Sequence, residues 1–221
     1  MVRKIKGAEI LLVPICIAVF STVTCFAACC EEYLAFVSLM YVVCVAAGFD
    51  SITAVAVLLE NVFNLIDIKS SHKVLDLFAG SGQIGIEFLS RGCKEVYFSD
   101  IDVKNIECIR KNLKKTGYEN HSVILRGSFE RNLKLIFKRR NERFDFIFLD
   151  PPYDSDYIKR ALKLIKSYDL LKKDGMIIIE STKMLEQEED SFKVLKEKKY
   201  KDIFIYILTG EDYEGYLSGK F

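Results

Sequence analysis

A mainly apolar run at residues 144–149 ends abruptly in the sequence Asp-Pro-Pro-Tyr. Each proline lacks a backbone N–H and fixes its own φ, and the second proline also restricts the first. The chain therefore continues past this point neither as a strand nor as the start of a helix. The pattern predicts a buried strand followed by a stiff elbow, which consists of Asp150, Pro151, Pro152 and Tyr153.

An elbow of this kind is suited to binding a planar amine. The carboxylate of Asp150 and the carbonyl of Pro151 accept hydrogen bonds from an NH2 group, and the ring of Tyr153 stacks on the plane that carries it. The elbow is therefore a candidate catalytic site. The alternative is an ordinary turn at the end of a strand with a tyrosine on the surface.

A second motif lies at residues 74–85, where a short apolar strand leads into a glycine-rich turn and a helix. Gly80, Gly82 and Gly85 match the G-x-G-x-x-G dinucleotide pattern, which is a weak signal by itself. Glycines allow close approach of a ligand to the backbone, and a helix N-terminus offers free N–H groups. Asp76 precedes the turn and favours a ligand bearing an amine or a sulfonium. In a nicotinamide site the strand usually leads directly to the first glycine, without an intervening Asp-Leu-Phe-Ala segment. The segment at residues 76–79 therefore argues against that cofactor.

The next predicted strand, at residues 95–99, is followed by Asp100, about twenty residues beyond the glycines. An acidic residue at this place accepts hydrogen bonds from both hydroxyls of a ribose. Asp102 is a competitor, although we expect it to cap the helix that follows. The alternative for Asp100 is a solvated surface acid.

These motifs, in this order, resemble the RsmD-like family of small ribosomal RNA methyltransferases, which methylate the exocyclic N2 of a guanine in 16S rRNA. The resemblance covers about residues 60–208 and implies S-adenosylmethionine as cofactor and small-subunit RNA as partner. We expect no metal, a cytoplasmic location and a monomer. The implied cofactor-binding residues are Asp76, Phe78, Ala79, Gly80, Ser81, Gly82, Asp100, Ile101, Ser128 and Phe129.

One departure from the family lies at residues 126–129, where similar methyltransferases often carry an acid that accepts from the adenine amino group. Here Ser128 is the candidate acceptor and Phe129 the candidate flank of the adenine. The alternative is a helix cap followed by a core aromatic residue.

After residue 69, apolar strands alternate with amphipathic helices, which predicts a sheet covered on both faces. We expect a Rossmann-like class I methyltransferase: an α/β fold with a doubly wound, mostly parallel, seven-stranded sheet and an antiparallel edge. The predicted strands are 73–78, 95–99, 121–126, 144–149, 175–181, 191–197 and 202–208, and the predicted helices are 83–91, 103–115, 128–139 and 156–167.

The first 58 residues depart from the family, which begins with a basic segment. After Lys6 there is no lysine or arginine until Lys69, and residues 10–30 are almost wholly apolar. We hold two interpretations open: translation in a disrupted reading frame, and a membrane anchor. The predicted domains are residues 1–58, a methyltransferase domain at 59–209 and a flexible tail at 210–221.

Charge gives only weak support for an RNA partner. Three of the 32 basic residues and six of the 31 acidic residues precede Lys69, which leaves 29 and 25 in the catalytic part. His72 and His121 have no neighbours at metal-ligand spacing. Two other classes stay open: methylation of adenine N6 in DNA or of another amine, and an inactive or membrane-anchored protein.

Overall fold

The computed structural model describes residues 63, 66–139, 142–152, 156–185, 192–200 and 203–210. The predictions for residues 1–58, for Tyr153 and for the tail beyond residue 210 lie outside these ranges. Within them, no helix is long and apolar enough to cross a membrane.

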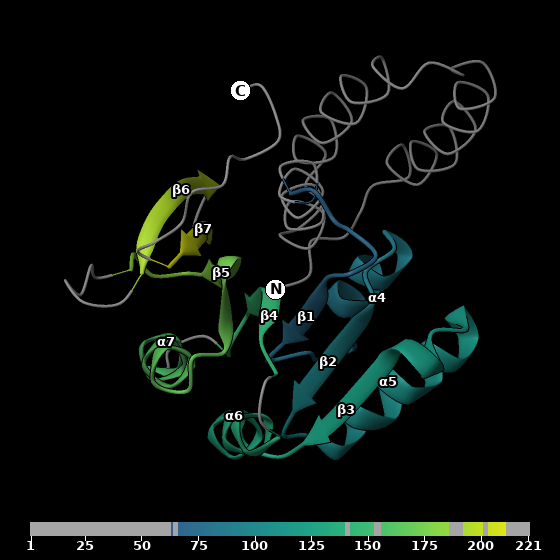
Figure 1. Cartoon of the computed structure of the whole chain (residues 1–221). Coiled ribbons are helices and arrows are strands. Elements are labelled where there is room, and N and C mark those ends of the chain that lie inside the picture. Colours follow the sequence, from purple (N-terminus) through teal and green to yellow (C-terminus); the bar gives the residue numbers. More distant parts are fainter. Residues whose placement is uncertain are drawn as a thin grey trace, which may run out of the picture. The chain divides into compact units, whose positions relative to one another are not determined.

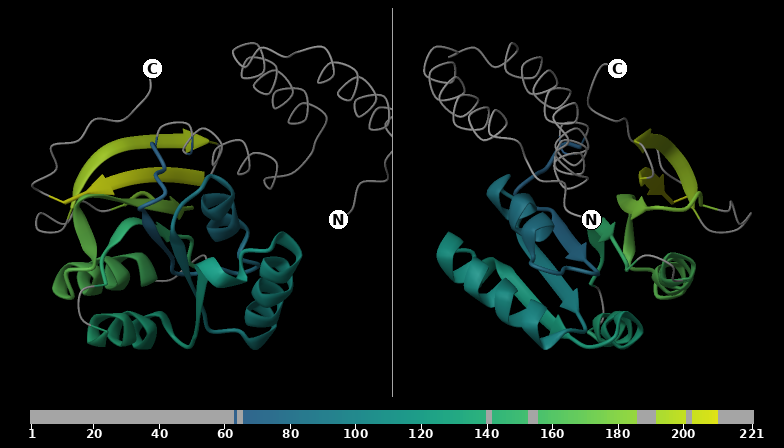
Figure 2. Two further views of the ribbon diagram at one scale, coloured as in Figure 1. Left: turned by 45° about the vertical axis from the view of Figure 1, so that its right-hand side comes forward. Right: turned by 180° about the vertical axis from the view of Figure 1, so that it is seen from behind.

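Seven strands form one sheet in the order β3-β2-β1-β4-β5-β7-β6 (Figure 1). The first five strands are parallel to one another, whereas β7 pairs antiparallel with both β5 and β6. The opposite directions of β6 and β7 are visible in Figure 2. The strands are β1 (Lys73–Asp76), β2 (Glu95–Asp100), β3 (Ser122–Arg126), β4 (Phe144–Leu149), β5 (Leu171–Ser181), β6 (Lys193–Tyr200) and β7 (Ile203–Thr209).

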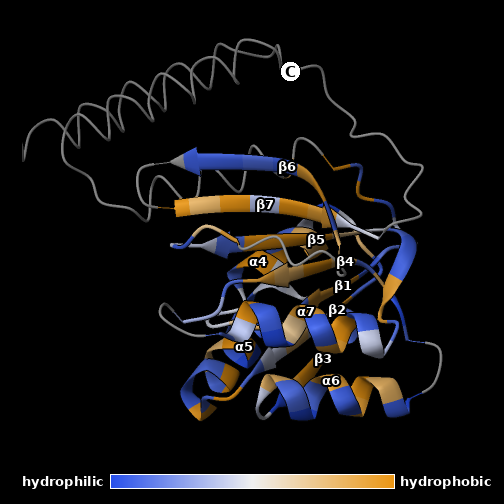
Figure 3. Cartoon of the chain, turned by 90° about the vertical axis from the view of Figure 1, so that its left-hand side faces the viewer, coloured by the Kyte–Doolittle hydropathy of each residue, from blue (hydrophilic) through white to orange (hydrophobic). Residues whose placement is uncertain are grey.

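Helices cover both faces of the parallel part of the sheet. Helices α4 (Gln83–Ser90) and α5 (Val103–Thr116) pack on β1, β2 and β3, and a short 3-10 helix, η1 (Glu119–His121), follows α5. On the other face lie α6 (Phe129–Lys138) and α7 (Tyr157–Ser167), which contact each other. The exposed helices carry apolar residues on one side and polar residues on the other, as the colours of Figure 3 show.

The core follows from the alternation of side chains along the strands. Leu75 and Ile147 belong to a buried cluster with Leu133 of α6 and Ile165 of α7. Residues one position away along the strands point to the opposite face, where Phe146 stacks against Phe88 of α4. Both faces of the central strands are thus buried, which is why these strands read as nearly continuous apolar runs.

The predicted fold class is confirmed, and the strand and helix ranges agree closely. The main difference is β5, which begins at Leu171 rather than at residue 175. Leu171 pairs with Phe144, so the polar residues between Leu171 and Gly175 extend the sheet past its apolar centre. Sequence patterns miss such an extension because its residues are exposed and lack apolar alternation.

The chain order reverses at β1, which lies between β2 and β4. In a doubly wound sheet, ligands bind beyond the carboxyl ends of the strands at such a switch point. Asp76 closes β1 and pairs in register with Phe148 of β4, two residues before Asp150. The two acidic strand ends therefore lie side by side.

Candidate active site

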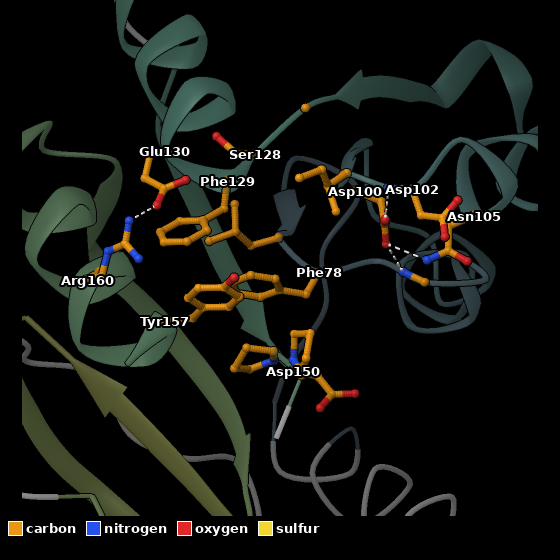
Figure 4. Close-up of a pocket in the computed structure, with 16 residues that line it drawn as sticks. Phe78, Asp100, Asp102, Asn105, Ser128, Phe129, Glu130, Asp150, Tyr157 and Arg160 are labelled. Atoms are coloured by element: carbon orange, nitrogen blue, oxygen red, sulfur yellow. Dashed lines mark hydrogen bonds and ion pairs between the residues drawn. The ribbon is translucent and has the colours of Figure 1, made fainter. Parts of the chain in front are cut away.

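A cleft of about 700 Å³ opens beyond the carboxyl ends of β1, β2 and β4. Its walls come from the glycine-rich turn, the ends of β2 and β3, the first turns of α6 and α7, and the proline elbow (Figure 4). The cleft is lined by Leu77, Phe78, Gly80, Asp100, Ile101, Asp102, Asn105, Gly127, Ser128, Phe129, Glu130, Asp150, Pro151, Pro152, Tyr157 and Arg160.

The glycine-rich turn forms the floor on the β1 side. Gly80 has a φ of 53° and Gly82 a φ of 79°, values that glycine adopts without the steric cost other residues incur. A Cβ on Gly80 would meet no other atom within 4 Å, so the backbone here is open to a ligand. At Gly85, in α4, a Cβ would lie 2.2 Å from Cε1 of Phe98, so this glycine allows the helix to pack against β2.

Asp100, at the end of β2, is anchored by the surrounding loops. Its Oδ2 accepts hydrogen bonds from the Gly80 N–H at 2.8 Å and from Nδ2 of Asn105 at 3.1 Å, and its Oδ1 accepts from the Asp102 N–H at 2.8 Å (Figure 4). The carboxylate is therefore fixed at the wall of the cleft. Asp102 caps α5 by accepting from the Lys104 N–H, as predicted.

Three aromatic rings form one wall. The ring centroids of Phe78 and Phe129 are 5.4 Å apart, and Tyr157 lies 5.2 Å from Phe129 and 6.0 Å from Phe78, parallel to the latter. The guanidinium of Arg160 lies over Phe129 and Tyr157 and pairs with Glu130. This ion pair joins α7 to α6 at the mouth of the cleft (Figure 4).

Asp150 and the two prolines form the opposite wall. The Asp150 carboxylate points away from the aromatic rings (Figure 4). Asp150 is in contact with solvent, but the surrounding protein atoms exclude part of the water around its carboxyl group. This desolvation raises the pKa of the carboxyl group to about 6. The group is therefore mainly ionised at neutral pH and able to accept hydrogen bonds.

Asp76 is not part of the cleft lining. It is 2% exposed, and its Oδ2 accepts from the Gly85 N–H at 3.1 Å, so that it ties β1 to α4. Burial, and then the negative charges of Asp150 and Asp100, raise its pKa to about 7. Asp76 thus lies just below the cleft floor.

The structure brings nine of the fourteen predicted site residues together around the cleft: Phe78, Gly80, Asp100, Ile101, Ser128, Phe129, Asp150, Pro151 and Pro152. Asp76, Ala79, Ser81 and Gly82 support this arrangement from outside the lining. Ser128 accepts from the Arg131 N–H at 3.4 Å and so caps α6, as the alternative reading proposed.

Sequence reasoning missed Tyr157, Arg160 and Asn105. Tyr157 and Arg160 are three residues apart on α7, and this spacing places them on one helix face directly after the elbow. Asn105 follows Asp100 by five residues, in the first turn of α5. Each residue is ordinary in its own helix, so only the spacing from a recognised motif carries a signal.

The histidines lie elsewhere. His72 directly precedes β1, its Nε2 lies 3.9 Å from the Asp145 carboxylate of β4, and burial lowers the pKa of this imidazole. Among the described residues, no group of three or more His, Cys, Asp or Glu side chains is arranged to hold a metal ion.

The sheet order and its cleft define a class of protein, the Rossmann-like class I methyltransferases. A solved structure of a conserved hypothetical protein from Streptococcus pyogenes superimposes with a TM-score of 0.63 at 30% identity, covering 70% of this chain and 96% of that one. A putative methylase from Haemophilus influenzae gives 0.59, also at 30% identity, covering 69% and 96%.

The chain belongs to the family described as Conserved hypothetical protein 95, whose model matches residues 54–209. A putative rRNA methyltransferase of Bacillus subtilis, YlbH, is 41% identical over 131 residues, which are 59% of this chain and 71% of the relative. Ribosomal RNA small subunit methyltransferase D of Haemophilus influenzae is 34% identical over 128 residues, 56% of this chain and 64% of the relative. The predicted RsmD-like resemblance is thereby confirmed.

Proposed function

We propose that this protein transfers the methyl group of S-adenosylmethionine to the exocyclic N2 of a guanine in small-subunit ribosomal RNA. The observation that carries the proposal is the convergence of Asp76, Asp100 and Asp150 at the ends of the adjacent strands β1, β2 and β4. The names of the relatives support ribosomal RNA as the substrate.

The lining of the cleft fits the proposed cofactor. The Asp100 carboxylate already accepts three hydrogen bonds. Its remaining lone pairs would accept hydrogen bonds from the ribose hydroxyls. Ile101, which is 71% exposed, and Phe129 offer apolar surfaces to the adenine. The open backbone at Gly80 and the carboxylate of Asp76 beneath it favour the positively charged part of the ligand. When bound, the cofactor supplies an electrophilic methyl group.

The elbow would hold the guanine. The Asp150 carboxylate and the Pro151 carbonyl accept from the N2 hydrogens and so direct the nitrogen lone pair at the methyl carbon. The nitrogen would gain the methyl group that the cofactor supplies, and the proton that the nitrogen loses would pass to Asp150 or to water. Positioning of this kind contributes on the order of 7–11 kcal/mol in well-oriented systems.

The base has to leave its helix to reach the elbow, at a cost of a few kcal/mol if it is paired. In the cleft, Pro152 and the ring of Tyr157 are available to pack against the base plane, and Tyr153 is a further candidate. We place the reaction in the cytoplasm, where ribosomal subunits are assembled, and we expect a monomer.

A labelling experiment tests the proposed methyl transfer. Tritiated S-adenosylmethionine is incubated with the full chain and with small ribosomal subunits from cells that lack the modification, followed by nucleoside analysis. Label in N2-methylguanosine of the small-subunit RNA is the expected result. Label found only in adenine of added DNA, or only in protein, would replace the proposal with one of the alternative amines.

The cofactor is tested separately by thermal unfolding. A ligand that binds only the native state raises the free energy of unfolding, by about 2.7 kcal/mol at a ligand concentration one hundred times Kd. The melting temperature rises as a result. S-adenosylmethionine is expected to raise the melting temperature and NAD to leave it unchanged. The opposite pattern would rule out the cofactor assignment.

A further inference from the structure

Glu180 is a buried acid whose purpose the proposed reaction leaves unexplained. It lies next to the last residue of β5 and is only 4% exposed. Among the described residues, Asp150 is the charged group that acts on this carboxyl group, through the repulsion of like charges. A carboxyl group that is removed from bulk water avoids the cost of a full negative charge by keeping its proton.

The strand register places Glu180 beside Asp150. Leu149, the last residue of β4, pairs with Ile179 of β5. The next residues along the chain are Asp150, directly after the end of β4, and Glu180 of β5. Side chains alternate between the two faces, and Leu149 and Ile179 both belong to the cluster on the α6 and α7 face. If this alternation continues past the end of β4, Asp150 and Glu180 share the opposite face, at the edge between strands about 4.8 Å apart. The charge of Asp150 acts on Glu180, which agrees with this placement.

Other charged groups lie farther from Glu180. Its neighbour on β7 is the apolar Ile205, and Lys198 lies beyond it, opposite Ile205 on β6. On the other side, Asp76 lies on β1, across β4. Helix α4 packs mainly on β1 and β2. Asp150 is thus the nearest charged group that the described strands present to Glu180.

The protonation behaviour of the two groups agrees with this geometry. Burial, and then the negative charge of Asp150, raise the pKa of Glu180 to about 7, whereas burial raises the pKa of Asp150 to about 6. Two adjacent carboxyl groups in poorly solvated surroundings resist carrying two charges, so near neutral pH the pair retains one proton. Glu180 is the more buried of the two, so the proton is favoured there.

We propose that Glu180 is a positioning residue for methyl transfer: in its protonated form it donates a hydrogen bond to the Asp150 carboxylate and fixes that carboxylate as acceptor for the amine. The inference rests on the proposed function, because it gives Asp150 the role of amine acceptor. Glu180 itself does not touch the substrate, and no net transfer of its proton is required.

The direct test is infrared difference spectroscopy of the full chain without RNA. A protonated carboxylic acid has a C=O band that a carboxylate lacks, so Glu180→Gln should remove one such band at pH 6.5. Asp150→Asn should shift the Glu180 band, because it replaces the acceptor. Absence of any protonated band that depends on Glu180 would overturn the proposal, whether or not the chain methylates RNA.

The functional test compares two substitutions. Glu180→Leu removes the donor, so kcat should fall about 10- to 100-fold, the range expected for a hydrogen bond to a charged group. Glu180→Gln offers an amide donor of similar size, so it should rescue kcat to within about threefold of the unsubstituted protein at pH 7. Neither should change the Kd for S-adenosylmethionine by more than about threefold, since Glu180 does not line the cleft.

The pH profile separates positioning from a merely structural role. With Glu180 present, kcat should decline above about pH 7, where Glu180 loses its proton and its donor. In Glu180→Gln this decline should be absent. Equal losses in the glutamine and leucine variants, or identical pH profiles, would show that donation to Asp150 is not the role of Glu180.

Asp174→Asn is the matched control. Asp174 is on the same strand, is exposed, and lies at the opposite end of β5, so its substitution removes the same charge far from Asp150. It should leave kcat and the pH profile unchanged. If the unsubstituted protein labels no RNA, the proposed function fails and the infrared result still decides the role of Glu180. If the protein is active and Glu180→Leu matches it, only this inference fails.

Discussion

The acidic residues at the strand ends differ in their surroundings, and these surroundings decide what each can do. Asp100 is held by three hydrogen bonds and is ready to accept from a polar ligand. Asp150 stands in the cleft beside rigid prolines, and Asp76 is enclosed below it. One residue type thus serves three positions, because hydrogen bonding and burial differ at each.

Asp150→Ala should lower kcat for methyl transfer about 10²- to 10⁴-fold, the range seen when a group that handles the reacting proton or its donor is lost. The Kd for S-adenosylmethionine should change by no more than about threefold, because in the proposed reaction the elbow binds the base and not the cofactor. Single-turnover transfer of labelled methyl groups measures the first quantity, and calorimetry measures the second.

Asp169→Asn is the control for that substitution. Asp169 pairs with Arg143 at the surface and has a φ of 50°, which asparagine tolerates well. Its activity should equal that of the unsubstituted protein. Full activity of Asp150→Ala would remove the elbow from the mechanism.

The raised pKa of Asp76 predicts how the stability of the fold depends on pH. Its pKa is about 7 in the folded protein, against 3.8 for an unperturbed aspartic acid, so folding favours the protonated form. Its contribution is most favourable below about pH 4 and is lost as pH rises towards and through 7, by up to about 4 kcal/mol in the limit of full burial. Asp76→Asn should therefore gain stability relative to the unsubstituted protein at pH 8 but not at pH 4.5.

Urea unfolding of both proteins at the two pH values measures this difference. Asparagine keeps a side-chain oxygen that accepts from the Gly85 N–H, so the hydrogen bond is matched. A stability difference that stays constant between pH 4.5 and 8 would mean that Asp76 is ionised throughout.

Among the elements, the contact of α4 with β2 is the most restrictive for sequence. Gly85 lies where any Cβ would collide with the ring of Phe98 and with Val96, at 2.2 and 2.9 Å. The helix therefore lies unusually close to the sheet, and this approach sets the position of the glycine-rich turn that begins it.

Gly85→Ala should destabilise the fold by about 1–3 kcal/mol, the usual cost of overpacking, despite the better helix propensity of alanine. Denaturant midpoints measure the change. Gly210→Ala is the control, because a Cβ there meets no atom within 4 Å and no positive φ is involved. A neutral Gly85→Ala would show that α4 moves away from β2 at little cost.

For the whole molecule, the family match begins at residue 54 and the domain we predict begins at residue 59. The described strands and helices all lie beyond that point. The part of this chain that superimposes on the solved structures from Streptococcus pyogenes and Haemophilus influenzae covers 96% of each of them. We propose that residues 59–221 are sufficient for folding and cofactor binding.

A chain that begins at residue 59 should unfold cooperatively and bind S-adenosylmethionine with a Kd within about threefold of the full chain. Circular dichroism and calorimetry on both chains measure this. A shortened chain that fails to fold would place the preceding residues within the folding unit and overturn the predicted boundary.

The sequence by itself determined the fold class, the order of the elements and nine of the residues around the cleft. It did so because buried parallel strands are nearly continuous apolar runs, and because glycines and prolines restrict the backbone locally. Only the tertiary structure shows that Tyr157, Arg160 and Glu180 lie at or near the cleft. Each looks ordinary in its own helix or strand, and each gains its place from a neighbour far away in the chain: Glu180 meets Asp150 only because β5 pairs with β4 in one register.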